Sequence, residues 1–124
     1  MKKTMKSIIT KVFWVAAIIS VVSIAYIQPA NAHPPKKVTL SFDSAQQTLS
    51  VTITHKTSFT SKHYVKSITI TRNGAAVSTE EYTSQPDESP YTYTYSVPAV
   101  AGDVIKVKAI CNIFGSKKAT ITVE

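Results

Sequence analysis

Apolar and polar residues alternate at every second position through most of the chain after residue 37. This period of two is typical of β-strands that bury one face. The alternation predicts about seven short strands, at residues 38–42, 49–55, 63–72, 77–84, 91–97, 105–111 and 119–123. No run of useful length has a helical period after residue 32, so we expect an all-β, immunoglobulin-like sandwich formed by one domain over residues 33–124.

Two of the predicted strands depart from simple alternation. Between residues 63 and 72, Ile68 and Ile70 share one face whereas Val65 falls on the other, which indicates a β-bulge. The strand over residues 77–84 is largely polar and carries Glu80 and Glu81, as expected of an edge strand that must discourage strand addition. Asn73-Gly74 lies between these strands and suits a two-residue hairpin turn.

Three tyrosines fall on one face of a single strand. Tyr91, Tyr93 and Tyr95 alternate with threonines, and Val97 continues their face. Exposed aromatic rings could form a platform for a sugar or a protein partner. In a small sandwich such a row more often packs in the core and along its rim, and we expect that role here.

The first 32 residues have the pattern of a secretory signal peptide. Four lysines precede an apolar run over residues 12–27, and Ala30-Asn31-Ala32 has small residues at the first and third places of a processing site. The run of 16 residues is shorter than the roughly 18 to 20 that span a bilayer. We therefore expect cleavage after Ala32 and a periplasmic or secreted protein without a membrane attachment, the alternative being an uncleaved anchor.

The positive charge of the chain belongs largely to this leader. The whole sequence has 14 basic and 7 acidic residues, but the part after residue 32 has ten basic and seven acidic residues and a charge near +3. A charge this small, spread over many positions, makes no stripe that could follow a phosphate backbone. Nucleic acid is therefore not an expected partner.

Cysteine and histidine are the residues that could carry chemistry. Cys111 is the only cysteine, so it forms no internal disulfide. It could pack in the core, form a disulfide with another chain or bind a metal. His55 and Cys111 each end an inward-facing apolar series, His63 opens the next strand, and His33 becomes the first residue after cleavage. Imidazoles and a thiolate are good ligands for iron, copper or zinc, although each residue alone could be an ordinary core or surface side chain.

Three local segments carry a resemblance to a known family. His33-Pro34-Pro35, then His55 with His63-Tyr64-Val65, then Cys111-Asn112-Ile113-Phe114-Gly115 resemble the H-x-P, H-P…H-[YW]-[IV] and C-N-x-H-G segments of the superoxide reductases. This family includes the iron domains of desulfoferrodoxin and neelaredoxin. The resemblance implies an immunoglobulin-like sandwich with a ferrous ion, a position open to superoxide and a separate electron donor. It implies further that His33, His55 and His63 are equatorial ligands and that Cys111 is the axial ligand.

The chain also differs from the family pattern. Phe114 stands where the family has a fourth histidine, and we expect it to close one side of the site with apolar surface. His55 and His63 are eight residues apart rather than six, and no four-cysteine rubredoxin-like module is present. The lysine that often precedes the family's first histidine would be removed with the leader. The candidates to attract the anion in its place are lysines near the histidines, namely Lys36, Lys37, Lys56 and Lys62.

Two other functions remain compatible with the sequence. Cleavage before His33 frees an α-amino group that could chelate a metal together with the His33 ring, and nitrogen and thiolate ligands of this kind favour copper. The protein would then be a metal-binding module of the cell envelope without catalytic turnover. The other possibility is a structural or adhesion-like sandwich that binds no metal.

Overall fold

The computed structural model describes residues 33–124, and the predicted signal peptide lies outside the described residues. Within residues 33–124 there is no helix, and hence none long and apolar enough to span a membrane. The chain forms seven strands here: β1 Lys37–Asp43, β2 Thr48–Thr54, β3 Val65–Arg72, β4 Ala75–Glu81, β5 Tyr91–Ser96, β6 Val104–Cys111 and β7 Ser116–Thr122. The predicted all-β fold is confirmed.

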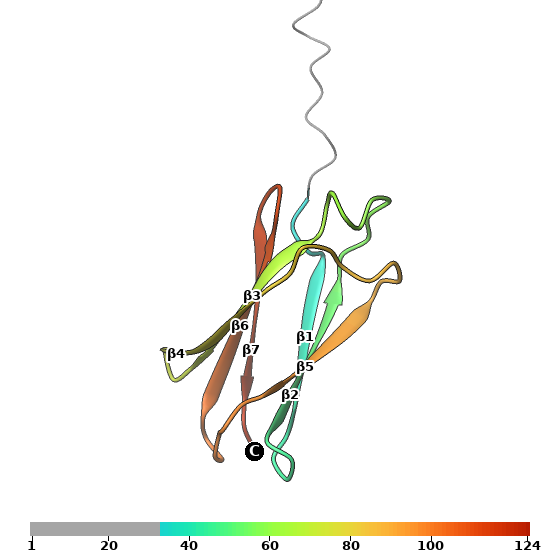
Figure 1. Cartoon of the computed structure of the whole chain (residues 1–124). Coiled ribbons are helices and arrows are strands. Elements are labelled where there is room, and N and C mark those ends of the chain that lie inside the picture. Colours follow the sequence, from blue (N-terminus) through green and yellow to red (C-terminus); the bar gives the residue numbers. More distant parts are fainter. Residues whose placement is uncertain (1–32) are drawn as a thin grey trace, which may run out of the picture. The chain divides into compact units, whose positions relative to one another are not determined.

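The strands form two antiparallel sheets that face each other (Figure 1). One sheet has the order β1-β2-β5 and the other the order β4-β3-β6-β7. Contacts between β1 and β7 join the sheets along one side. This is the immunoglobulin-like sandwich expected from the alternation, in the variant in which the fourth strand pairs with the third.

The core is built from the inward positions of both sheets. Leu49, Val51 and Ile53 alternate with half-buried polar residues along β2 and are fully buried. They meet buried aliphatic side chains of the opposite sheet, namely Ile68, Ile70, Ile105, Val107 and Ala109. Because β2 and β6 each bury one face, the register of these strands is strongly specified.

The two predicted irregularities are both present. The register of β3 against β6 shifts between Val65 and Ser67, so that Val65 and Ile68 both face the core despite their different phase. Asn73 and Gly74 have φ values of 52° and 82°, as a two-residue hairpin turn requires. The strand that follows, β4, is an edge strand and exposes Glu80 and Glu81.

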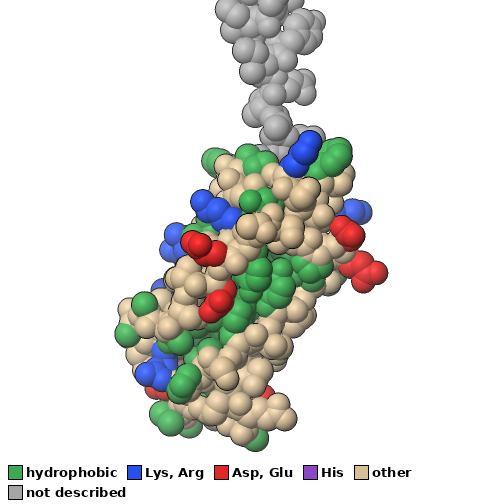
Figure 2. Space-filling model, viewed as in Figure 1, with side chains coloured by type: hydrophobic (Ala, Val, Ile, Leu, Met, Phe, Trp, Pro, Cys, Tyr) green, Lys and Arg blue, Asp and Glu red, His purple; other side chains and the backbone are tan. Residues whose placement is uncertain are grey.

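Tyrosine side chains close the side of the sandwich between the edge strands β4 and β5. Tyr91 is buried, and Tyr93 and Tyr95 are half-buried against the core. Tyr82, just after β4, stacks on Tyr93 with ring centroids 4.5 Å apart and an interplanar angle of 5°. Figure 2 shows hydrophobic side chains gathered in a band on this face. The row therefore packs at the core and its rim, as predicted.

Several loops and strand termini lie together at one end of the sandwich, opposite the C-terminus (Figure 1). The segment before β1, the loop from β2 to β3 and the β6–β7 hairpin all lie there. This is the end at which the predicted metal ligands occur.

Candidate metal centre

Three histidines from three separate segments come together at this end. His33 precedes β1, His55 directly follows β2, and His63 lies just before β3. Their candidate ligand nitrogens all lie within 4.8 Å of one another. The ring centroids are 4.7 to 5.1 Å apart, and the rings meet edge to face. Three of the four predicted metal ligands are thus brought into one cluster, which could hold a metal ion.

His55 is fully buried and is held by the side chain of Gln85. The Nδ1 atom of His55 lies 2.7 Å from Oε1 of Gln85, and Nε2 of Gln85 donates to the backbone oxygen of His55 at 2.6 Å. The backbone N–H of Val65 also donates to Oε1 of Gln85, at 3.2 Å. Because of these partners, the oxygen of the Gln85 amide faces the His55 ring. Nδ1 of His55 must therefore be the donor.

This hydrogen bond determines which ring nitrogen of His55 can bind a metal. A neutral imidazole has one N–H, and here Gln85 holds it at Nδ1. The lone pair is then at Nε2, which lies 3.2 Å from the backbone oxygen of His33. A cation bound at Nε2 of His55 would relieve the repulsion between this lone pair and the oxygen. Hydrogen bonds that fix the tautomer in this way are characteristic of metal-bound histidines.

His63 also has an unsatisfied ring nitrogen. Its Nε2 is buried and has no hydrogen-bond partner among the described residues. Burial lowers the pKa of the His63 imidazole, and repulsion from His55 lowers it further. The ring is therefore held in its neutral form, which is the form that binds metals.

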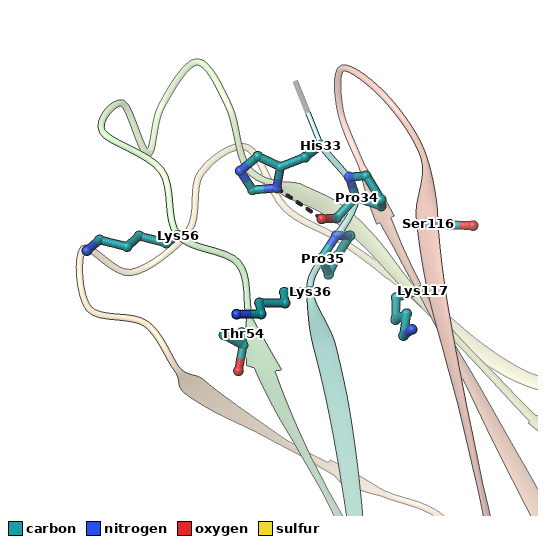
Figure 3. A pocket seen from close by; sticks show the side chains of 8 residues that line it. All are labelled: His33, Pro34, Pro35, Lys36, Thr54, Lys56, Ser116 and Lys117. Atoms are coloured by element: carbon teal, nitrogen blue, oxygen red, sulfur yellow. Dashed lines mark hydrogen bonds between the residues drawn. The ribbon is translucent and has the colours of Figure 1, made fainter. Parts of the chain in front are cut away.

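His33 is exposed and is positioned by its own segment. Its Nδ1 donates to the backbone oxygen of Pro34 at 3.0 Å, which leaves the lone pair on Nε2 (Figure 3). Pro34 in turn lies against the β6–β7 hairpin, because a Cβ added to Gly115 would be 2.9 Å from Cβ of Pro34. Gly115 has a φ of 79°, so glycine is favoured here both by conformation and by this close approach.

Asn112 joins the segment after Cys111 to the segment around His63. Its Oδ1 accepts from the backbone N–H of Tyr64, and its Nδ2 donates to the backbone oxygen of Lys62, both at 2.9 Å. The backbone N–H of Asn112 also donates to the oxygen of Tyr64 at 2.9 Å. His63 is therefore held on both sides by one asparagine.

Cys111 lies close in the fold to His63 but outside the histidine cluster. It ends β6, pairs with Val65 of β3 and is 3% exposed. Its Sγ is not one of the atoms that lie within 4.8 Å of one another among the described residues. The only hydrogen bond of Sγ in this part of the chain is a long one to Oδ1 of Asn112, at 3.9 Å. Its assignment as the axial ligand stays a prediction.

A pocket of about 670 Å³ lies beside His33. Two of the lysines proposed to attract an anion, Lys36 and Lys56, line it, together with Lys117 of β7. Figure 3 shows these lysines on both sides of the His33–Pro35 segment. No acidic side chain is among the described residues that line the pocket, so its potential is positive. Lys37 and Lys62 do not line it.

Phe114 does not close the site as we expected. Its side chain is 65% exposed, and that of the adjacent Ile113 is 51% exposed. Both residues lie in the short turn between β6 and β7, whose backbone turns back at Gly115. Because this tight turn directs its side chains outward, the ring of Phe114 lies largely in solvent.

Gln85 is a residue of the site that sequence reasoning did not single out. The residues from Gln85 to Pro90 fold over His55, whose backbone N–H donates to Oγ of Ser89 at 3.0 Å. Oγ1 of Thr60, in the loop between His55 and His63, donates to Asp87 at 3.0 Å. No local pattern marks Gln85, because two of its partners, His55 and Val65, are 30 and 20 positions away along the chain.

Comparisons with protein-family models, with curated proteins and with solved structures find no match to this chain. The resemblance to the superoxide reductases therefore stays a prediction. The histidine cluster fits a metal ion on its own chemistry, because it combines a buried unpaired nitrogen with a tautomer fixed by Gln85.

Proposed function

We propose that the protein is an exported mononuclear non-haem iron protein that reduces superoxide to hydrogen peroxide. His33, His55 and His63 would bind the metal through nitrogen, and Cys111 would provide a thiolate ligand. The observation that carries the proposal is the convergence of three imidazoles, one of them with a buried and unpaired Nε2. Such a nitrogen costs free energy unless it binds a cation or takes part in a hydrogen bond.

Cys111 belongs to the proposal because of its position in the sheet. It pairs with Val65, two residues after His63, and Asn112 ties the two segments together. Its thiol is buried, so bulk solvent does not compete for it. A metal cation beside the thiol would favour the thiolate form and would gain a charged ligand.

The reaction consumes one electron and two protons for each superoxide that becomes hydrogen peroxide. Iron(II), when bound, supplies the electron. Lys36, Lys56 and Lys117 beside His33 attract the anion and raise its local concentration. Gln85 holds the His55 ring in the orientation and tautomer that binding requires. Water reaches the exposed His33 side of the site and supplies the protons.

The test starts from protein that begins at His33, reconstituted with iron(II). We expect about one iron per chain, a visible absorption band from thiolate to ferric iron after oxidation, and consumption of superoxide. His63→Ala should lose the iron, and Cys111→Ala should lose the absorption band. Asp103→Asn, in the β5–β6 loop away from the site, is the matched control and should keep the iron content, the absorption band and the superoxide consumption of the natural chain. Failure to bind iron, or full activity of the Cys111→Ala protein, would refute the assignment.

A second candidate is a copper-binding module that uses the freed α-amino group of His33. Its support is that the chain lacks the fourth imidazole of the superoxide reductases. Chelation by the amine and the same ring would use Nδ1, which in this structure donates to Pro34 instead. One residue added before His33 should abolish copper binding of this kind, whereas binding through Nε2 of His33 should survive the addition.

A further inference from the structure

An unbroken series of contacts leads from His55 to the tyrosines that close the side of the sandwich. Oε1 of Gln85 lies 2.7 Å from Nδ1 of His55 and accepts from the phenol of Tyr91 at 3.3 Å. The ring of Tyr91 meets that of Tyr93 edge to face, with centroids 5.4 Å apart. One amide thus connects the candidate metal site to the first ring of the row.

The series continues to a hydrogen-bonded pair at the surface. Tyr93 stacks on Tyr82 at 4.5 Å and meets Tyr95 edge to face at 6.4 Å. The phenol oxygens of Tyr82 and Tyr95 are 2.7 Å apart. Tyr91 is buried, whereas the other three rings are half-buried, so the series runs from the interior to solvent.

The composition of the domain makes these tyrosines most of its readily oxidised side chains. Phenol, indole and sulfur groups are the side chains that lose an electron most readily. The chain has one tryptophan and two methionines, and all three lie before residue 33. After the leader, the readily oxidised side chains are Cys111 and five tyrosines, four of which belong to this series.

We propose that Tyr82, Tyr91, Tyr93 and Tyr95 conduct oxidising equivalents from the metal centre to the surface. The inference rests on the proposed function, whose product, hydrogen peroxide, is the oxidant. Electrons pass from the tyrosines toward the metal centre. The tyrosines that remain oxidised at the end are the hydrogen-bonded pair, Tyr82 and Tyr95. Cys111 and the histidines are thereby spared from oxidation.

The electrons and protons of this process balance. Each tyrosine that is oxidised loses one electron and one proton and becomes a neutral phenoxyl radical. Hydrogen peroxide takes up two electrons and two protons and becomes two waters, so one peroxide corresponds to two oxidised phenols. The protons leave through the half-buried phenols of Tyr82 and Tyr95, which reach solvent.

The arrangement of the rings favours conduction over ligand binding. A platform for a sugar or a peptide presents ring faces to solvent. Here the face of Tyr93 is covered by Tyr82, and the phenol oxygens of Tyr82 and Tyr95 are bonded to each other. The rings are therefore directed toward one another and toward Gln85.

The first experiment treats iron-loaded protein with hydrogen peroxide and freezes it for electron paramagnetic resonance. We expect a tyrosyl radical signal in the natural protein. The signal should be lost in the Tyr82→Phe/Tyr95→Phe double variant and in Tyr91→Phe, while iron content is unchanged. Tyr64→Phe is the control, because Tyr64 lies outside the series, and it should keep the signal. Peptide mapping should find more oxidised Cys111 in the two variants that lose the signal.

A second experiment tests conduction without the native metal. A ruthenium polypyridyl photo-oxidant is attached to the exposed ring of His33, and a laser flash withdraws one electron. The phenoxyl radical should form in the natural chain and in Tyr64→Phe but not in Tyr91→Phe. Iron binding without any tyrosyl radical in either experiment would overturn the conduction proposal alone. Absence of iron binding together with a normal flash response would overturn the proposed function alone.

Discussion

At the scale of single residues, neutral polar side chains rather than charges hold the candidate metal centre. Gln85 sets the tautomer of His55, and Asn112 fixes both sides of His63. Each amide bonds both to a ligand segment and to backbone groups far away in the sequence. Removal of either amide should therefore affect metal binding and stability together.

Gln85→Leu should weaken metal binding by about 10- to 100-fold, the usual effect of losing a partner of a metal-bound histidine. It also leaves Nδ1 of His55 and the N–H of Val65 unpaired, which should lower the free energy of unfolding by about 1–3 kcal/mol for each buried group. Titration calorimetry with iron(II) or zinc(II) and denaturant unfolding measure the two effects.

Gln47→Leu is the matched control for this prediction. Gln47 also bonds to backbone groups, accepting from the N–H of Ala99 at 2.7 Å and donating to the oxygen of Ser44 at 2.9 Å. It lies in the β1–β2 turn, away from the histidines. This variant should lose stability but keep its metal affinity; equal losses of affinity in both variants would contradict the role given to Gln85.

The role of a single residue could be predicted from the sequence only where the residue belongs to the alternating pattern of a strand. His55 follows Leu49, Val51 and Ile53 in phase, so its burial could be read from the alternation. Gln85 lies in a loop without periodicity, and its role depends on partners that only the folded chain brings near. The role expected of Phe114 came only from a family resemblance, and the turn that exposes its ring is a property of the backbone.

At the scale of elements, the β6–β7 hairpin positions the segment that carries His33. Gly115 touches Pro34, and the backbone oxygen of Gly115 accepts from the N–H of Cys111 at 3.0 Å. The hairpin thus reaches both the first and the last of the predicted ligands.

Gly115→Ala should reduce both stability and metal affinity. The positive φ costs about 1–3 kcal/mol for a residue with a Cβ. The added Cβ would also push Pro34, and with it His33, away from the site. Thermal unfolding and metal titration measure these changes.

Gly102→Ala separates the two causes. Gly102 has a φ of 90°, but nothing lies within 4 Å of an added Cβ. It should show a loss of stability from the backbone conformation and no change in metal affinity. If Gly115→Ala also left the affinity unchanged, the hairpin would not position His33.

Asp103, in the loop that joins β5 and β6, should make a contribution to the stability of the fold that is lost in acid. Hydrogen bonds from the backbone N–H of Val100 and then from the side chain of Asn73 lower the pKa of Asp103. A carboxyl whose pKa is lower in the folded state stabilises the fold above its unfolded pKa of about 3.8. This contribution disappears as the pH falls through the folded pKa.

Asp103→Asn should therefore flatten the fall in melting temperature between about pH 5 and pH 2. Thermal unfolding over this range compares the variant with the natural chain. Glu81→Gln is the control, since it removes one negative charge from an exposed position of β4 and should keep the natural slope. Parallel curves for the natural chain and Asp103→Asn would contradict this assignment.

The strands were largely predictable from the alternation, and the loops were not. Each strand needs only one buried face, which a period of two records in the sequence, whereas the loop at Gln85 is shaped by contacts to β2, β3 and β5. The bulge at Val65 was predictable because a change of phase within one strand leaves few other ways to bury both apolar sets.

At the scale of the whole molecule, the domain has no internal disulfide to support a small core. A metal ion bound only by the folded state stabilises it by mass action, by about 2.7 kcal/mol at a free concentration 100 times the dissociation constant. In a domain of this size that corresponds to a rise of about 10–20 °C in melting temperature.

Saturating iron(II) or zinc(II) should therefore raise the melting temperature by roughly this amount, and a chelator should reverse the change. The His55→Ala/His63→Ala double variant should show no metal-dependent shift. A similar shift in that variant would mean that the ion stabilises the chain at some other place.

The three imidazoles also differ in how firmly the rest of the domain holds them. His55 is enclosed and His63 is anchored by its neighbours, whereas His33 is exposed and precedes the first strand. An ion held by this cluster would meet the two anchored rings first and the third afterwards, and it would leave in the reverse order. The residence time of such an ion would then depend on the few residues ahead of β1, so substitutions at Pro34 or Pro35 would change how quickly it is exchanged while His55 and His63 stay in place.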